Sequence, residues 1–166
     1  MKNQERNGFP FSIALFTAID ANTELDDAIF PNLEFIDRLG YTTQLIVASK
    51  ISKKLSAQPS PTLFHQNFVQ FDPQDNTQYA LGIGARYKLT NRWSINADYG
   101  YHLNRADGSP FVNPLSIGFD LETGGHVFQL HFTNAQPMLT NNFLSQGTGD
   151  WTEGTFFFGF NLVRVF

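Results

Sequence analysis

The chain alternates apolar and polar residues over long stretches, and residues 77–103 show this most clearly. Every second position is apolar on both sides of the polar tripeptide Thr90-Asn91-Arg92. Alternation on both sides of a short polar turn predicts a β-hairpin. The strands exceed the ~5–6 residues usual in globular proteins and match the ~9–11 residues of a tilted membrane-spanning strand.

The same pattern predicts eight strands in the whole chain. They are expected at residues 9–20, 40–51, 56–70, 78–89, 93–104, 114–122, 126–134 and 154–166. Pro59 and Pro61 lie near the start of the third strand, and prolines demote a strand to the edge or rim of a sheet. Residues 136–146 are compatible with a short helical turn.

The connections between these strands alternate in length. Those at 52–55, 90–92 and 123–125 are short, those at 21–39, 105–113 and 135–153 are long, and the one at 71–77 is intermediate. Gly124 and Gly125 are expected to supply positive φ angles in a tight turn. In an antiparallel up-and-down sheet this alternation gathers the short turns at one end and the long loops at the other, as in outer-membrane barrels.

The two faces of the predicted strands indicate which one meets lipid. The polar face mixes glycines with charged and amide side chains, which suits a crowded lumen better than a solvated exterior. Its proposed lumenal cluster is Arg86, Lys88, Asp98, Asp120, Glu122, Gln129 and His131. On the apolar face, Tyr87, Trp93, Tyr99 and Tyr101 are candidates for the aromatic girdles at the membrane surfaces. A soluble β-barrel with an apolar core is the alternative.

The chain ends on GTFFFGFNLVRVF, residues 154–166. An apolar terminal strand needs a cover, and lipid supplies it. Phe158, Phe160, Leu162 and Phe166 fit the C-terminal signal by which the outer-membrane insertion machinery recognises its substrates. Arg164 lies on the same face, where a long cationic side chain can snorkel to the interface.

Composition narrows the function classes. With 166 residues the default is a single domain, here taken as 1–166. The net charge of −4 and the lack of a basic block give nucleic-acid binding no support. The chain has no cysteine, which excludes disulfides and thiolate metal sites. No apolar run reaches the ~20 residues of a transmembrane helix.

Several segments carry a more specific resemblance. PLSIGFDLETGGHVFQLHFTNAQPML at 114–139, TGDW at 148–151 and GFNLVRVF at 159–166 resemble an uncharacterised family of bacterial outer-membrane β-barrels, a domain of unknown function. YTTQLIVASKISKKLSAQPSPTLFHQNFV and GARYKLTNRWSINADY extend the resemblance over nearly the whole chain from residue 10.

The resemblance implies an antiparallel transmembrane barrel with no settled activity. Family members normally begin with a signal peptide and several further strands, so this chain is expected to be the C-terminal portion of a larger barrel. In a rival interpretation, Lys2, Arg6 and residues 9–19 form a signal peptide, although Asp20 stands where a small-residue cleavage motif should be. Eight strands can close a small barrel, whereas a fragment of a larger one leaves two open edges.

Candidate chemistry is sparse. His126 and His131 are five residues apart on one strand and therefore point to opposite faces, so they cannot share a metal. His102 with Asp98 lacks a positioned nucleophile, and Asp72, Asp75 and Asn76 are explained as turn residues. No enzyme activity, metal or cofactor is expected. The lumenal cluster is either a charged constriction that filters solutes or a salt-bridge network that plugs a narrow barrel.

Two functions remain from the sequence. The protein is predicted to be a porin-like or transport-associated channel of the bacterial outer membrane, with the lipid bilayer and the insertion machinery as partners. The alternative is a structural or interaction barrel with a plugged lumen, whose external loops bind a solute or a protein.

Overall fold

A computed structural model describes residues 4, 8–23, 25, 29–30, 32–69 and 71–164 of the chain. Eight strands form one antiparallel sheet in which each strand pairs with its neighbours in sequence, from β1 to β8. The elements are β1 Ser12–Ala21, the 3-10 turn η1 Ile36–Arg38, β2 Leu39–Lys50, β3 Leu55–Gln66, β4 Thr77–Lys88, β5 Trp93–His102, β6 Leu115–Thr123, β7 His126–Thr133, the short helix α1 Thr140–Ser145 and β8 Phe157–Arg164. No helix in these ranges is long and apolar enough to span a membrane.

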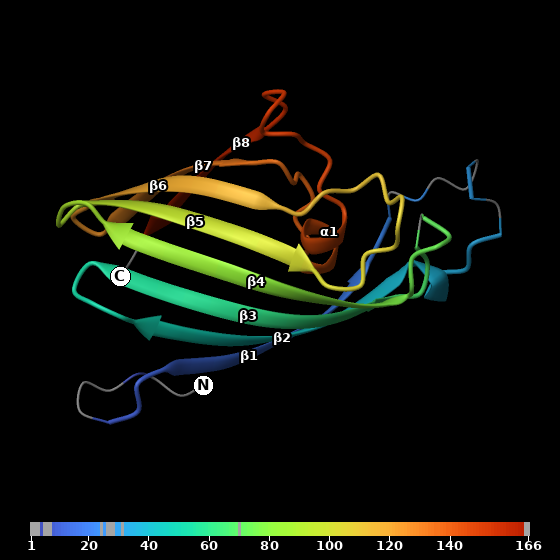
Figure 1. Cartoon of the computed structure of the whole chain (residues 1–166), viewed down its shortest axis with the longest axis horizontal. Coiled ribbons are helices and arrows are strands. Elements are labelled where there is room, and N and C mark those ends of the chain that lie inside the picture. The colour runs from blue at the N-terminus through green and yellow to red at the C-terminus, as the bar shows by residue number, and fades with distance from the viewer. Residues whose placement is uncertain are drawn as a thin grey trace.

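The eight predicted strands and their up-and-down order are confirmed (Figure 1). The short connections 51–54, 89–92 and 124–125 lie at one end of the sheet, and the long ones, 22–38, 67–76, 103–114 and 134–156, lie at the other. Gly124 and Gly125 have φ angles of 52° and 105° and close the tightest of the turns, as predicted. The predicted helical turn is α1, within the last long connection.

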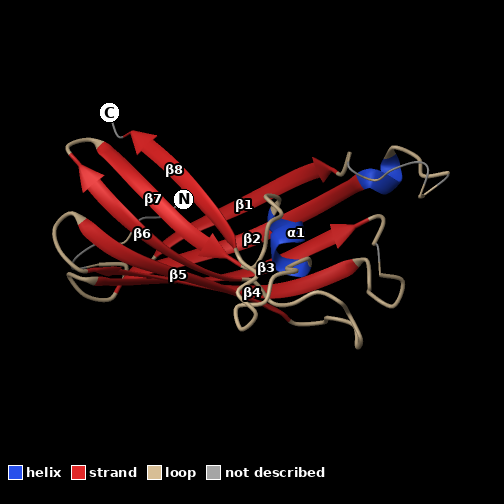
Figure 2. Cartoon of the chain, turned by 90° about the horizontal axis from the view of Figure 1, so that it is seen from above, coloured by secondary structure: helices blue, strands red, loops and turns tan. Residues whose placement is uncertain are grey.

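The sheet curves into a trough that stays open along one side (Figure 2). β1 and β8 are its two edges and do not pair with each other in the described part of the chain. The eight strands therefore form half of a barrel. Within lipid, the backbone groups along an open edge have no water to bond, so both edges require further strands to complete the barrel.

The expectation for β3 was wrong, because this strand lies inside the sheet and pairs with both β2 and β4. Pro59 and Pro61 are two residues apart, so their backbone nitrogens face the same neighbouring strand. Neither nitrogen carries a hydrogen, so both hydrogen bonds are lost on that one side. The ladder with β2 is interrupted between the pairs Gln44–Thr62 and Ser49–Ala57, while the ladder with β4 continues through both prolines. The sheet thus accepts the two prolines at the cost of hydrogen bonds on one side only.

The polarity of the fold is inverted relative to that of a soluble protein. Large apolar side chains cover the convex face, and Leu15 and Ile19 of β1 are 67% and 73% exposed. The buried side chains of the strands are mostly polar: Thr42, Ser60, Thr62, Gln78, Ser94, His102 and Asp120. A small apolar cluster of Phe64, Ala80 and Leu144 is the exception. Such an arrangement is stable only where the convex face meets an apolar medium.

A pair of arginine substitutions tests this orientation. Ile83→Arg, in the middle of β4 on the convex face, should lower the free energy of unfolding from a bilayer by about 2–4 kcal/mol. Gln58→Arg, on the concave face of β3 beside the Ile83–Pro59 pair, should cost much less. Urea unfolding from lipid vesicles measures both effects, and equal costs at the two positions would contradict the assignment of the faces.

Candidate functional site

The concave face carries the polar side chains that strand alternation predicted to share one side. Cross-strand register places them in adjacent rows, because directly paired residues project to the same face. The predicted cluster is distributed over four strands: Arg86 and Lys88 on β4, Asp98 on β5, Asp120 and Glu122 on β6, and Gln129 and His131 on β7.

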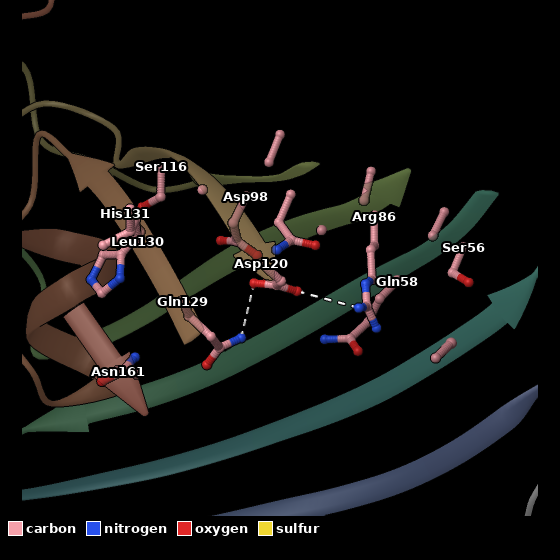
Figure 3. Close-up of a pocket in the computed structure, with 17 residues that line it drawn as sticks. Ser56, Gln58, Arg86, Asp98, Ser116, Asp120, Gln129, Leu130, His131 and Asn161 are labelled. Carbon is pink, nitrogen blue, oxygen red and sulfur yellow. Dashed lines mark hydrogen bonds and ion pairs between the residues drawn. The ribbon is translucent and has the colours of Figure 1, made fainter. Parts of the chain in front are cut away.

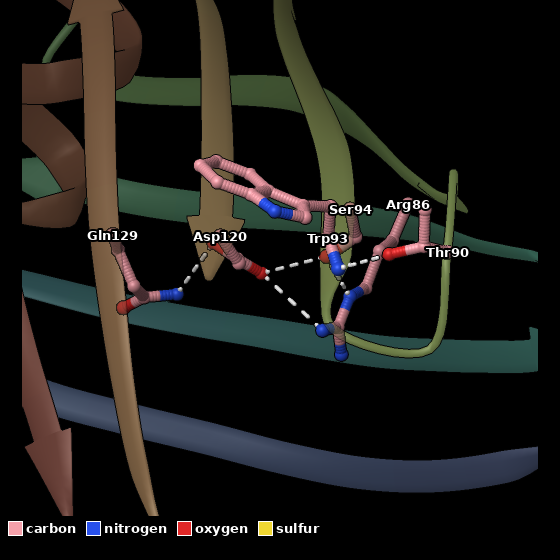
Figure 4. A network of polar contacts seen from close by, with 6 residues as sticks. All are labelled: Arg86, Thr90, Trp93, Ser94, Asp120 and Gln129. Atoms are coloured by element: carbon pink, nitrogen blue, oxygen red, sulfur yellow. Dashed lines mark hydrogen bonds and ion pairs between the residues drawn. The ribbon is translucent and has the colours of Figure 1, made fainter. Parts of the chain in front are cut away.

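Asp120 is the centre of a network within this cluster (Figure 4). Its side chain is nearly buried, and Arg86 Nη2 lies 3.5 Å from its Oδ2 atom. Ser94 Oγ donates to Oδ2 at 3.2 Å, and Gln129 Nε2 donates to Oδ1 at 3.1 Å. Arg86 Nε also donates to Ser94 Oγ at 2.9 Å. Both carboxylate oxygens are therefore satisfied, which offsets the cost of taking the charge out of water.

The structure does not bring the rest of the predicted cluster into this network. Lys88 and Glu122 lie beside the short turns, and in the described part of the chain neither forms an ion pair. The ring of His131 lies over Gly159 of β8, in the space that a Cβ atom at that position would fill. His131 therefore packs across two strands near one edge of the sheet.

Next to the network the concave face is hollowed (Figure 3). The hollow has a volume of about 480 Å³ and is lined by residues from β2 to β8, among them Gln58, Arg86, Asp98, Asp120 and His131. It opens to solvent, so water and small polar solutes can enter. Its lining offers hydrogen-bond donors, acceptors and charges, and is suited to polar rather than apolar molecules.

The last long connection folds into the trough. α1 contacts both β2 and β5, so it bridges the concave face above β3 and β4 (Figure 2). Asn141 Nδ2 donates to both oxygens of Asp20 on β1, at 3.0 and 3.3 Å. Gln66 Nε2 on β3 donates to Asn142 Oδ1 at 2.8 Å. The helix thus narrows the long-loop half of the trough and leaves the short-turn half open.

Apolar and cationic contacts complete the anchoring of α1. Leu144 packs against Phe64 and Ala80. Arg105, in the connection after β5, donates from Nη1 to the carbonyl oxygen of Ser145 at 2.9 Å. Burial lowers the pKa of Arg105, yet a guanidinium stays charged at neutral pH. A second hollow of about 290 Å³ remains between α1 and the sheet.

Sequence reasoning missed the residues that hold α1, namely Asp20, Gln66, Asn141 and Asn142. Asp20 and Asn141 are 121 positions apart, and no local pattern joins them. The available signal was Phe143-Leu144, an apolar pair inside a polar connection.

The convex face carries the predicted lipid-facing residues. Tyr87 and Trp93 lie at the short-turn end, and Tyr99 and Tyr101 lie towards the long-loop end, all four exposed. Trp93 and Tyr101 are about 26 Å apart along β5 at ~3.3 Å per residue, comparable with the ~25 Å apolar band of membrane barrels.

The last strand presents the apolar residues of the predicted insertion signal. Phe158, Phe160 and Leu162 project from the convex face of β8 and are exposed. Arg164 pairs with His126 at the end of the same face. Phe166 lies outside the described residues.

His126 lies on the convex face and His131 on the concave face, as the strand spacing predicted. Among the described residues, no three His, Asp or Glu side chains gather closely enough to hold a metal ion.

Removing the Asp120 carboxylate should destabilise the folded barrel. Asp120→Ala removes the acceptor of the hydrogen bonds from Gln129 and Ser94 and leaves Arg86 without its counter-ion. The guanidinium of Arg86 stays partly solvated, because its side chain is 41% exposed. The expected loss is about 2–3 kcal/mol, read from the midpoint of urea unfolding in lipid vesicles. Glu122→Gln, exposed near the turn, is the matched control and should stay within about 0.5 kcal/mol of the parent. An equal loss in both variants would show that the network contributes nothing specific.

Comparison with known proteins agrees with this geometry. No curated protein and no solved structure matches the chain significantly. One family model, described as "Membrane bound beta barrel domain (DUF5777)", matches residues 1–166. The match confirms the resemblance to an uncharacterised barrel family and agrees with the outward placement of the apolar side chains. The chain belongs to this family of membrane-bound β-barrel domains, whose function is unknown.

Proposed function

We propose that the protein is a porin-like channel of the bacterial outer membrane that passes small polar solutes. The observation that carries the proposal is the open polar hollow of about 480 Å³ on the concave face of a sheet whose convex face is apolar. This hollow offers room and hydrogen-bond partners to small polar solutes. The sorting of short and long connections to opposite ends supports the outer membrane as the location.

In this proposal α1 is the constriction of the channel. It crosses the trough at the long-loop end and is held by side chains of β1, β3 and the connection after β5. A solute entering from that end passes beside α1 before it reaches the wider hollow. A hollow of about 290 Å³ remains between α1 and the sheet, so the helix narrows the path without filling it.

The competing proposal is an interaction barrel with a plugged lumen, and the docking of α1 in the trough supports it too. In that case the exposed connections bind a partner and the polar concave face serves only stability. The two proposals differ in whether ions pass through the folded protein.

Conductance across a planar lipid bilayer distinguishes them. The full-length protein, shown to be folded by its heat-modifiable migration in gels, should give stable open steps in potassium chloride. Silence from folded protein would refute the channel and direct attention to the long connections.

Releasing α1 should enlarge the open steps. Leu144→Asp places a charge against Phe64 and Ala80 and should undock the helix. The unitary conductance is then expected to rise about twofold or more, since a pore conducts in proportion to its narrowest section. Gln136→Ala, an exposed position of the same connection, is the control and should leave the conductance unchanged. If both variants conduct like the parent, α1 is not the constriction.

A further inference from the structure

Three carboxylates lie on the concave face away from the short turns, and they differ in their hydrogen bonds and ion pairs. Asp20 accepts hydrogen bonds from Asn141, and Asp120 is bound by Arg86, Ser94 and Gln129. Asp98 forms no hydrogen bond or ion pair with any residue in the described part of the chain. Of the three, it is the carboxylate that this part of the fold leaves with neither a hydrogen-bond partner nor a counter-ion.

The surroundings of Asp98 leave space in front of it. Its direct cross-strand partners are Gly84 on β4 and Ser116 on β6, and Gly100 follows it on the same face of β5. Asp98 Oδ2 lies over Gly84, where a Cβ atom would come within 3.1 Å of it. The missing side chain at Gly84 therefore lets this carboxylate lean across the floor of the trough towards β3, whereas the space over Gly100 is occupied by Leu144 and Pro114.

Asp98 also stands where the two hollows meet. It lines both the open hollow of about 480 Å³ and the hollow of about 290 Å³ beneath α1, and Gln58 is the other side chain shared by both. A solute that moves between the constriction and the wide part of the trough has to pass this side chain.

The nearby cations do not cancel its charge. Arg86, diagonal to Asp98 on β4, is engaged by Asp120. Lys88 lies on the same face of β4, two residues beyond Arg86 and beside the short turn. The facing residues of β3 and α1 that line these hollows are uncharged, and Glu122 at the turn end of β6 adds a further negative charge.

We propose that Asp98 is a cation-binding position at the junction of the two hollows and makes the channel selective for cations and for solutes with a positively charged group. This inference rests on the proposed channel function. The carboxylate supplies the attraction, and the two hollows that it lines supply the room for a hydrated cation beside it.

The reversal potential under a potassium chloride gradient measures the selectivity. A unit charge about 8 Å from a permeating ion in a water-like medium raises the occupancy of the cation and lowers that of the anion by somewhat more than twofold each, so the cation-to-anion permeability ratio should fall about fivefold in Asp98→Asn. Asp98→Glu should retain the ratio of the parent. Asp72→Asn removes an equal charge from an exposed connection and should leave the ratio unchanged. At 1 M salt the effect should vanish, because the Debye length falls to about 3 Å.

A second readout does not require conduction. The chain has no cysteine, so Asn96→Cys introduces a single thiol on the concave face, two residues from Asp98. The thiol should react faster with a cationic methanethiosulfonate that carries a trimethylammonium group than with an anionic methanethiosulfonate that carries a sulfonate group. That preference should fall about fivefold when Asp98→Asn is added. Asp98→Ser replaces Asp98→Asn if the latter fails the gel test of folding.

The outcomes separate the two proposals. If the protein conducts, and Asp98→Asn changes neither the permeability ratio nor the labelling preference, the role of Asp98 is refuted and the channel function is retained. A silent protein whose labelling preference falls in the variant overturns the channel and retains the cation-attracting carboxylate. Silence with an unchanged preference overturns both.

Discussion

Within a membrane, the backbone has to satisfy its own hydrogen bonds, and the rest of this structure depends on that constraint. Strands β2 to β7 meet it by pairing on both sides, and β3 does so although Pro59 and Pro61 interrupt one of its ladders. The outer edges of β1 and β8 are the places where it is not met. Since eight is an even number, β1 and β8 run in opposite directions, and further antiparallel strands in even number can close the barrel while keeping the long connections at one end.

The same constraint explains the polar interior. Once the apolar side chains face outwards, the concave face keeps only the small apolar cluster of Phe64, Ala80 and Leu144, so most of its side chains are held by polar contacts. The Asp120 network spans β4 to β7, and the Asp20–Asn141 and Gln66–Asn142 contacts attach α1 to β1 and β3. These contacts are specific in direction and distance, which lets a helix of six residues take a defined place in the trough.

Alternation in the sequence was sufficient to predict the strands, their order and their two faces, because period-2 patterning and turn length can be read from short stretches of the chain. It placed Arg86 and Asp120 on one face but could not pair them, since that contact depends on the register of β4, β5 and β6 together. The prolines of β3 misled because edge location is the usual rule for proline, whereas one interrupted ladder sufficed here. The docking of α1 was beyond sequence reasoning, as it joins residues 121 positions apart.

The electrical character of the trough follows from the placement of charges rather than from their number. The chain carries 15 acidic and 11 basic residues, a modest excess that says little about selectivity. Charges on the long connections are screened by salt within about 10 Å at 0.1 M. The charge of Asp120 is balanced by Arg86, whereas Asn141 binds Asp20 as a neutral amide at the long-loop end of β1. Asp98 has neither a counter-ion nor a hydrogen-bond partner in the described residues and lies where the two hollows join, so we assign the cation selectivity of the proposed channel to it.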